Sequence, residues 1–122
     1  MPIIQFHLDD RSPFTEDFII SKDATLPDLE VQLLDESAVV DLTGATIKFS
    51  MDDQLGVAKV NAVSAVLSDG PNGKFKYQWV AADTNTEGIF FGQFEVTAAT
   101  KIYRIPDNEK QRLRIVVGPR IN

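Results

Sequence analysis

Two aromatic-rich segments with strict alternation, residues 73–80 and 88–96, form the strongest pattern in the sequence. In the first segment Phe75, Tyr77 and Trp79 alternate with polar residues, and apolar residues alternate in the same way through the second. A period of two is typical of a β-strand with one buried face. Because a polar, turn-rich stretch joins the segments, we predict a hairpin whose two aromatic rows face one hydrophobic core.

Weaker alternation predicts further short strands and no helix beyond a single turn at residues 109–112. Within residues 57–67 the alternation changes phase, which predicts either a β-bulge or a strand that crosses from one sheet to the other. The turn at residues 41–44 ends in Gly44, which suits a positive φ angle. The further predicted strands are residues 4–8, 18–21, 29–34, 45–52, 57–67, 97–105 and 112–117.

About eight or nine short strands separated by turns predict an all-β fold, an antiparallel β-sandwich. The length of 122 residues fits one domain over residues 1–122. The sequence contains no cysteine, which excludes a disulfide, a thiolate metal site and a thiol nucleophile. A formal net charge of −6 argues against binding to nucleic acids or to anionic membranes. We see no signal peptide and no apolar segment long enough for membrane insertion, so we expect synthesis in the cytoplasm.

The sequence offers few groups for catalysis or metal binding. His7 is the single histidine, lies on the polar side of a terminal strand and is expected to be an ordinary surface residue. Possible oxygen ligands for calcium occur at Asp9-Asp10, Asp52-Asp53 and Asp107-Asn108. They match no calcium-loop spacing, and we expect solvated turn residues there. No glycine-rich phosphate loop is present. We therefore predict no catalytic, cofactor-binding or metal-binding residues, and a protein that is not an enzyme.

Aromatic residues leave two alternatives open. The row Phe75, Tyr77 and Trp79 either fills the core or forms a platform on which sugars stack, and alternation with polar residues favours the core. If Phe90 and Phe94 face the core, Ile89 and Phe91 face the opposite side of the sheet. Such an outward pair is either covered by another part of the chain or contacts a partner. Our contact candidates are Ile89, Phe91 and Tyr103, with unpaired edge strands as a second means of association.

An ordered set of short motifs resembles a known family. Residues 40–51 read VDLTGATIKFSM, a tight turn followed by an alternating strand that ends in Met. Together with the motifs that follow, this segment resembles the amino-terminal domain of phage upper baseplate proteins and related tail-module proteins, over residues 40–117. The later motifs are Gly73-x-x-x-Tyr77-x-Trp79, Asp83-Thr84, Gly88-x-Phe90, Phe94-x-Val96 and Pro106.

The resemblance implies an immunoglobulin-like β-sandwich that anchors a tail or baseplate component to its neighbours and performs no catalysis. Phe90 and Gly92 stand where immunoglobulin-like domains place a corner Tyr and a Cys, so neither that hydrogen bond nor that disulfide can form. In the family this domain usually precedes a helical, fibre-like extension. The present sequence ends at Asn122, so we expect either a stand-alone tail accessory or a shortened form.

These observations predict a phage virion protein that is a structural module of the tail or baseplate. We expect it to bind other tail or baseplate proteins and to be docked in several copies on a symmetric particle, with a homo-oligomer as one arrangement. The alternative hypothesis is a carbohydrate-binding β-sandwich for attachment to a host surface, which requires Trp79 to be exposed.

Overall fold

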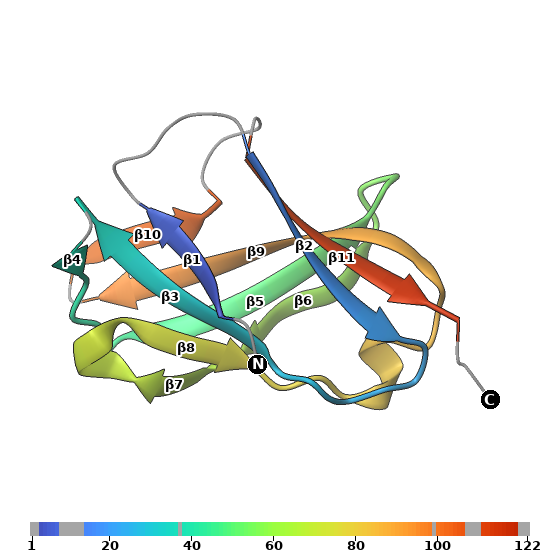
Figure 1. The fold of residues 1–122 in the computed structure, drawn as a ribbon, viewed down its shortest axis with the longest axis horizontal. Coiled ribbons are helices and arrows are strands. Elements are labelled where there is room, and N and C mark those ends of the chain that lie inside the picture. The colour runs from blue at the N-terminus through green and yellow to red at the C-terminus, as the bar shows by residue number, and fades with distance from the viewer. Residues whose placement is uncertain (1–2, 8–13, 37, 99, 107–110, 120–122) are drawn as a thin grey trace.

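The computed structural model describes residues 3–7, 14–36, 38–98, 100–106 and 111–119. Within these ranges the chain forms two β-sheets that pack face to face, with two single-turn 3₁₀ helices in the connections (Figure 1). The first sheet has the order β1 (Ile4–His7), β3 (Leu29–Asp35), β8 (Lys74–Tyr77) and β7 (Val66–Asp69), with β4 (Ala38–Val39) also paired to β3. The second has the order β2 (Phe14–Ser21), β11 (Gln111–Gly118), β9 (Gly88–Ala98), β5 (Thr46–Asp53) and β6 (Ala58–Ser64), with β10 (Lys101–Ile105) also paired to β9.

Aromatic rings from both sheets meet in the centre of the sandwich. Phe49 on β5 is fully buried, and its ring centroid lies 4.5 Å from that of Tyr77 and 4.8 Å from that of Phe94. The ring of Trp79 meets Phe49 edge to face at 5.7 Å, and Phe75 meets Phe94 in the same way at 4.9 Å. The predicted burial of the two aromatic rows in one core is therefore confirmed, and so is the all-β sandwich.

The predicted hairpin between the aromatic segments is wrong. β8 belongs to the first sheet and β9 to the second, and residues 78–87 connect them with the 3₁₀ helix η2 (Ala81–Asp83) on the way. Two strands that face one core from opposite sheets have the same alternation as two strands paired in a hairpin. The pattern fixes which side chains point inward, but it does not fix which strand is the hydrogen-bonded neighbour.

The described residues form eleven strands, more than the eight or nine expected, and not all of them pair in the predicted antiparallel sense. β1 runs parallel to β3, and β2 runs parallel to β11 over the full register from Phe14↔Gln111 to Ser21↔Gly118. The N-terminal part of the chain thus supplies one strand to each sheet. Only Gln111 and Arg112 of the helical turn predicted at 109–112 are described, and both belong to strand β11.

The phase change predicted within residues 57–67 has both of the expected causes. β6 pairs with β5 in the second sheet with two register shifts, and Ala62 there has a positive φ of 51°. After Ala65 the chain continues as β7 in the first sheet. The strand therefore carries bulges and then crosses between the two layers.

Two glycines are required where the chain turns sharply. Gly44 has the predicted positive φ, at 79°. Gly73 ends the 3₁₀ helix η1 (Gly70–Asn72) with φ 70°, and a Cβ placed there would lie 2.6 Å from the carbonyl oxygen of Val40 and 2.8 Å from that of Leu33. Only glycine tolerates both the left-handed backbone and this close approach of two carbonyl groups.

A buried polar pair closes one end of the core. The Tyr77 hydroxyl donates a 2.7 Å hydrogen bond to Oδ2 of Asp83, and the same oxygen accepts the Val80 backbone N–H at 3.1 Å. Burial, together with this carboxylate, raises the pKa of Tyr77 well above its usual value. Asp83 is 7% exposed, so its carboxylate keeps hydrogen-bond partners in place of the water that it loses.

We expect Phe49→Ala to lower the free energy of unfolding by about 3–5 kcal/mol, because it removes a fully buried ring that contacts aromatic rings from both sheets. Urea denaturation followed by tryptophan fluorescence measures this change. The control is Leu55→Ala, since Leu55 is 90% exposed; a change within about 0.5 kcal/mol is expected there. Equal effects of the two substitutions would contradict the central role of Phe49.

We also expect stability to fall as the pH rises above roughly 10, where an unfolded tyrosine ionises. Tyr77 holds its proton more tightly when folded, so its contribution is complete below that pH and is lost as the pH rises toward its raised folded pKa. Denaturation midpoints measured from pH 8 to pH 11 test this, with Tyr77→Phe as the matched control. The variant should show a smaller decline than the wild type; an identical decline would refute the assignment.

Candidate functional site

Ile89 and Phe91, both predicted as contact residues, lie on the outer face of the second sheet. Both are half-buried and belong to β9, whose inner face carries Phe90 and Phe94. Ile89 is the cross-strand partner of Val116 on β11, and Val116 is in turn the partner of Ile19 on β2. We call Ile19, Val116, Ile89 and Phe91 the outer stripe. Ile19, Val116 and Ile89 form an apolar row across three neighbouring strands, and Ile19 at its end is 71% exposed. Phe91 lies two residues further along β9, between Arg114 of β11 and Asp52 of β5.

Charged side chains border the outer stripe. The guanidinium of Arg112 lies 5.7 Å from the centroid of the Phe91 ring, within the range of a cation–π contact. Arg114 makes a two-pronged pair with Asp17, with Nε to Oδ1 at 2.8 Å and Nη2 to Oδ2 at 2.7 Å. These hydrogen bonds hold the pKa of Asp17 below its ordinary value. The stripe therefore combines an apolar centre with a polar rim, the arrangement seen in protein–protein contact surfaces.

Tyr103, the third predicted contact residue, lies elsewhere. On β10 it is the cross-strand partner of Val96, a fully buried residue, and it packs against the core. Directly paired antiparallel residues point to the same side of a sheet, so Tyr103 faces inward whereas Ile89 and Phe91 face outward. Sequence alternation did not identify Ile19 and Val116, because only the parallel pairing of β2 with β11 brings them beside Ile89.

The aromatic row considered as a sugar platform lies inside the molecule. Phe75, Tyr77 and Trp79 are 0%, 2% and 4% exposed. The Trp79 indole stacks on Phe18 at 5.8 Å, and its buried Nε1 has no hydrogen-bond acceptor among the described residues. No flat aromatic face of this row is presented to solvent, so it does not support the carbohydrate-binding alternative.

The other residues considered for chemistry have local roles or lie outside the described ranges. Oδ1 of Asp53 accepts the backbone N–H groups of Leu55 and Val57 at 2.9 Å, which closes the turn between β5 and β6. His7 is exposed on β1. The other two possible calcium-binding pairs, Asp9-Asp10 and Asp107-Asn108, fall outside the described part of the chain.

Residues 3–7, 14–36, 38–98, 100–106 and 111–119 contain neither a metal-binding cluster nor a membrane-spanning helix. No group of three or more His, Cys, Asp or Glu side chains in these ranges is arranged to hold a metal ion. None of the helices formed by the same residues has the length and apolar character needed to cross a bilayer.

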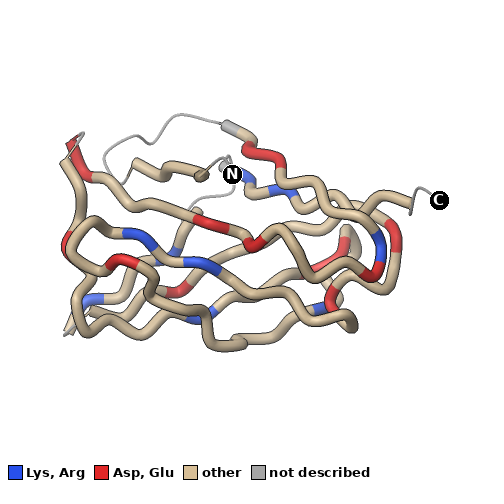
Figure 2. The backbone as a smooth tube through the Cα atoms, turned by 60° about the horizontal axis from the view of Figure 1, so that its bottom comes forward, with Lys and Arg blue, Asp and Glu red and all other residues tan. Residues whose placement is uncertain are grey.

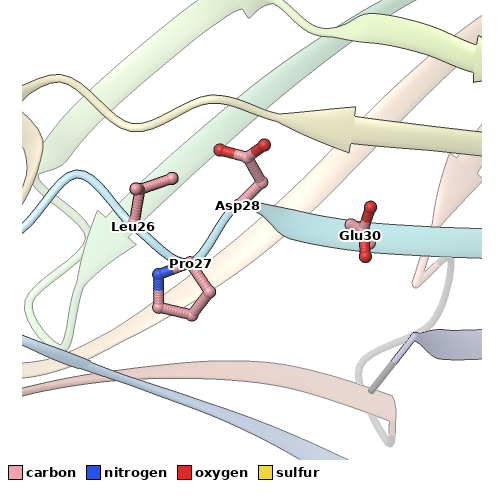
Figure 3. Close-up of a pocket in the computed structure, with 4 residues that line it drawn as sticks. All are labelled: Leu26, Pro27, Asp28 and Glu30. Atoms are coloured by element: carbon pink, nitrogen blue, oxygen red, sulfur yellow. The ribbon is translucent and has the colours of Figure 1, made fainter. Parts of the chain in front are cut away.

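A shallow hollow that the sequence did not indicate lies at the entrance to β3. Leu26, Pro27, Asp28 and Glu30 line it, all from one short segment (Figure 3). Leu26 is 71% exposed, and Asp28 forms an ion pair with Lys76 of β8 at 3.6 Å.

Positive and negative residues are interspersed along the described backbone. In the view of Figure 2 no continuous band of Lys and Arg follows one strand.

Comparison with known proteins identifies the fold. No family model matches the sequence, and no curated protein matches it. Among solved structures, the chain is similar to the N-terminal domain of phage TP901-1 ORF48, with a TM-score of 0.59 and 14% sequence identity over 95% of this chain and 96% of that one. A second similar structure is the bradyzoite-specific antigen BSR4 of Toxoplasma gondii, with a TM-score of 0.45 and 13% identity over 93% of this chain and 46% of that one.

Proposed function

We propose that this chain is a structural module of a phage tail or baseplate, present in the virion and acting through protein–protein contacts. The observation that carries the proposal is the likeness to the N-terminal domain of ORF48, the baseplate protein BppU, over nearly the whole length of both chains. The ordered motifs from Val40 to Pro106 point to the same family from the sequence alone. Backbone geometry and sequence motifs are separate kinds of support, and they agree on one family.

In this proposal the sandwich is immunoglobulin-like and serves as a rigid body. A core that joins both sheets through stacked and edge-on rings keeps its outer faces in fixed positions. The outer stripe is the docking surface, and it includes the contact candidates Ile89 and Phe91. Tyr103 is retained as a contact candidate at the β9–β10 edge of the same sheet. The module needs no cofactor and no catalytic group, and its partners are other tail or baseplate proteins.

Mass spectrometry of purified phage particles tests the assignment. We expect peptides of this chain in virions, at a constant ratio to a known tail protein. Separately purified products of the neighbouring genes would then be tested one at a time for binding to the intact protein. A panel of host glycans serves as the competing test. Glycan binding without a virion partner, or absence from purified particles, would overturn the proposal.

We predict that Phe91→Asp and Ile89→Asp each weaken binding to the virion partner by about tenfold or more, because each replaces an apolar contact side chain by a charged one. Isothermal titration calorimetry with the purified partner measures the loss. Val39→Asp is the matched control, since Val39 is 45% exposed on β4 of the other sheet. If the control weakens binding as much as the two stripe variants do, the outer stripe is not the docking surface.

A further inference from the structure

The segment from Lys59 to Asp69 forms an uncovered rim of the whole sandwich. β6 is the last strand of the second sheet and β7 the last strand of the first, and no further described strand pairs with either. Because the chain passes from β6 to β7 at Ala65, one continuous segment supplies both edges, and Figure 1 shows β6 and β7 along the same lower side. Residues 61–64 of this segment are all exposed.

The rim lacks the charges that usually protect edge strands. Residues 60–68 read VNAVSAVLS and include no charged side chain and no proline, although a quarter of the whole sequence is charged. Exposed edges are normally protected from pairing with other chains by charged or proline residues. Two other edge strands follow that rule: β2 carries Glu16 and Asp17, and β10 carries Lys101 and Arg104. The edge strand β1 does not, and it is only four residues long.

The rim sequence is complementary to itself about Ser64. In an antiparallel pair of two copies centred on this residue, Ser64 meets Ser64 and Val63 meets Ala65. Continued outward, the same register places Lys59 of one copy opposite Asp69 of the other, at both ends of the pair. Opposite charges directly across an antiparallel pair are stabilising, whereas like charges are destabilising. The chemistry of the segment therefore fits a second copy of itself.

The irregularities of the rim are compatible with this register. The pairing of β6 with β5 shifts twice, between Val63 and Val60 and again between Val60 and Ala58, where Lys59 lies. The pairing of β7 with β8 shifts once, between Leu67 and Asp69. Both arms thus carry a bulge between Ser64 and the charged residue, so the two charges meet through their side chains and not through a continuous backbone ladder. The N–H of Ala62 is held by Oγ of Ser50 at 3.0 Å, which confines regular pairing to the residues around Ser64.

We propose that two copies of this protein associate about a twofold axis at Ser64, with β6 of each copy antiparallel to β7 of the other. Both copies carry a net charge of −6, so contacts that bring acidic side chains of the two copies together are unfavourable. The rim provides an approach without that cost, because its centre is uncharged and its ends carry opposite charges. Such a contact is isologous, the same patch on both copies, and closes at two subunits.

A single introduced cysteine tests the axis, because the natural sequence has none. Under mild oxidation Ser64→Cys is expected to form a disulfide-linked dimer, since directly paired strand residues have a Cα separation within disulfide range. Ser68→Cys is the control for register, and Ser21→Cys, on the exposed edge strand β2, is the control for random collision. Cross-linking of Ser64→Cys no faster than either control would overturn the proposal, and so would a wild-type protein that sediments as a monomer at every concentration.

Exchange of the two charges tests the ends of the pair. Lys59→Glu and Asp69→Lys should each weaken the dimer by about tenfold, because each turns two attractive pairs into repulsive ones. The double variant Lys59→Glu/Asp69→Lys should restore wild-type dimerisation in sedimentation equilibrium. In the monomer Lys59 bonds Oδ1 of Asn85 at 2.6 Å and Asp69 bonds Nδ2 of Asn72 at 2.8 Å, so thermal unfolding must confirm that each variant is folded. A folded double variant that does not recover would refute the register.

This dimer is independent of the tail-module assignment. Self-association in sedimentation and cross-linking requires no virion partner, and substitutions in the outer stripe leave the rim intact. Loss of partner binding by Phe91→Asp with an unchanged dimer, or the reverse, would therefore identify which of the two surfaces failed.

Discussion

The contact of Phe49 with aromatic rings of the opposite layer is the interaction on which the rest of this structure depends. Its ring lies on β5 in the second sheet, and it meets Tyr77 of the first sheet at 4.5 Å and Trp79, which follows β8, at 5.7 Å. On its own sheet it meets Phe94, which in turn contacts Phe75 across the sandwich. Space for this cluster is made by Gly92, where a Cβ would lie 2.9 Å from Cε1 of Phe49. A protein without disulfides holds its two layers together mainly by such burial.

The N-terminal strands add a second constraint. β1 joins the first sheet and β2 the second, each as a parallel neighbour of a strand far away in the sequence. The pairing of β2 with β11 places Ile19 beside Val116 and aligns Asp17 with Arg114. The outer stripe and its ion-paired border therefore exist only because the first part of the chain returns to the last strand. Local sequence carries no trace of this meeting.

Two surfaces of different kinds follow from one sandwich. The outer stripe is a sheet face, apolar at its centre and charged at its border. The rim from Lys59 to Asp69 is an edge, where backbone groups and self-complementary side chains are available for the proposed pairing. A face and an edge at different sides of a rigid body can be occupied at the same time, so the two proposed contacts do not exclude each other.

The sequence alone determined which side chains point inward. Alternation identified Phe75, Tyr77, Trp79 and Phe94 as core residues, because burial of one face imposes a period of two on any strand. The phase change within residues 57–67 predicted a bulge or a crossing between layers, and the structure has both. It also placed Ile89 and Phe91 on an outward face. Which strands became neighbours was decided only by tertiary structure: β8 and β9 face each other across the core, and β2 lies parallel to β11. Periodicity records the environment of a residue, whereas pairing between distant segments depends on how the whole chain closes around its rings.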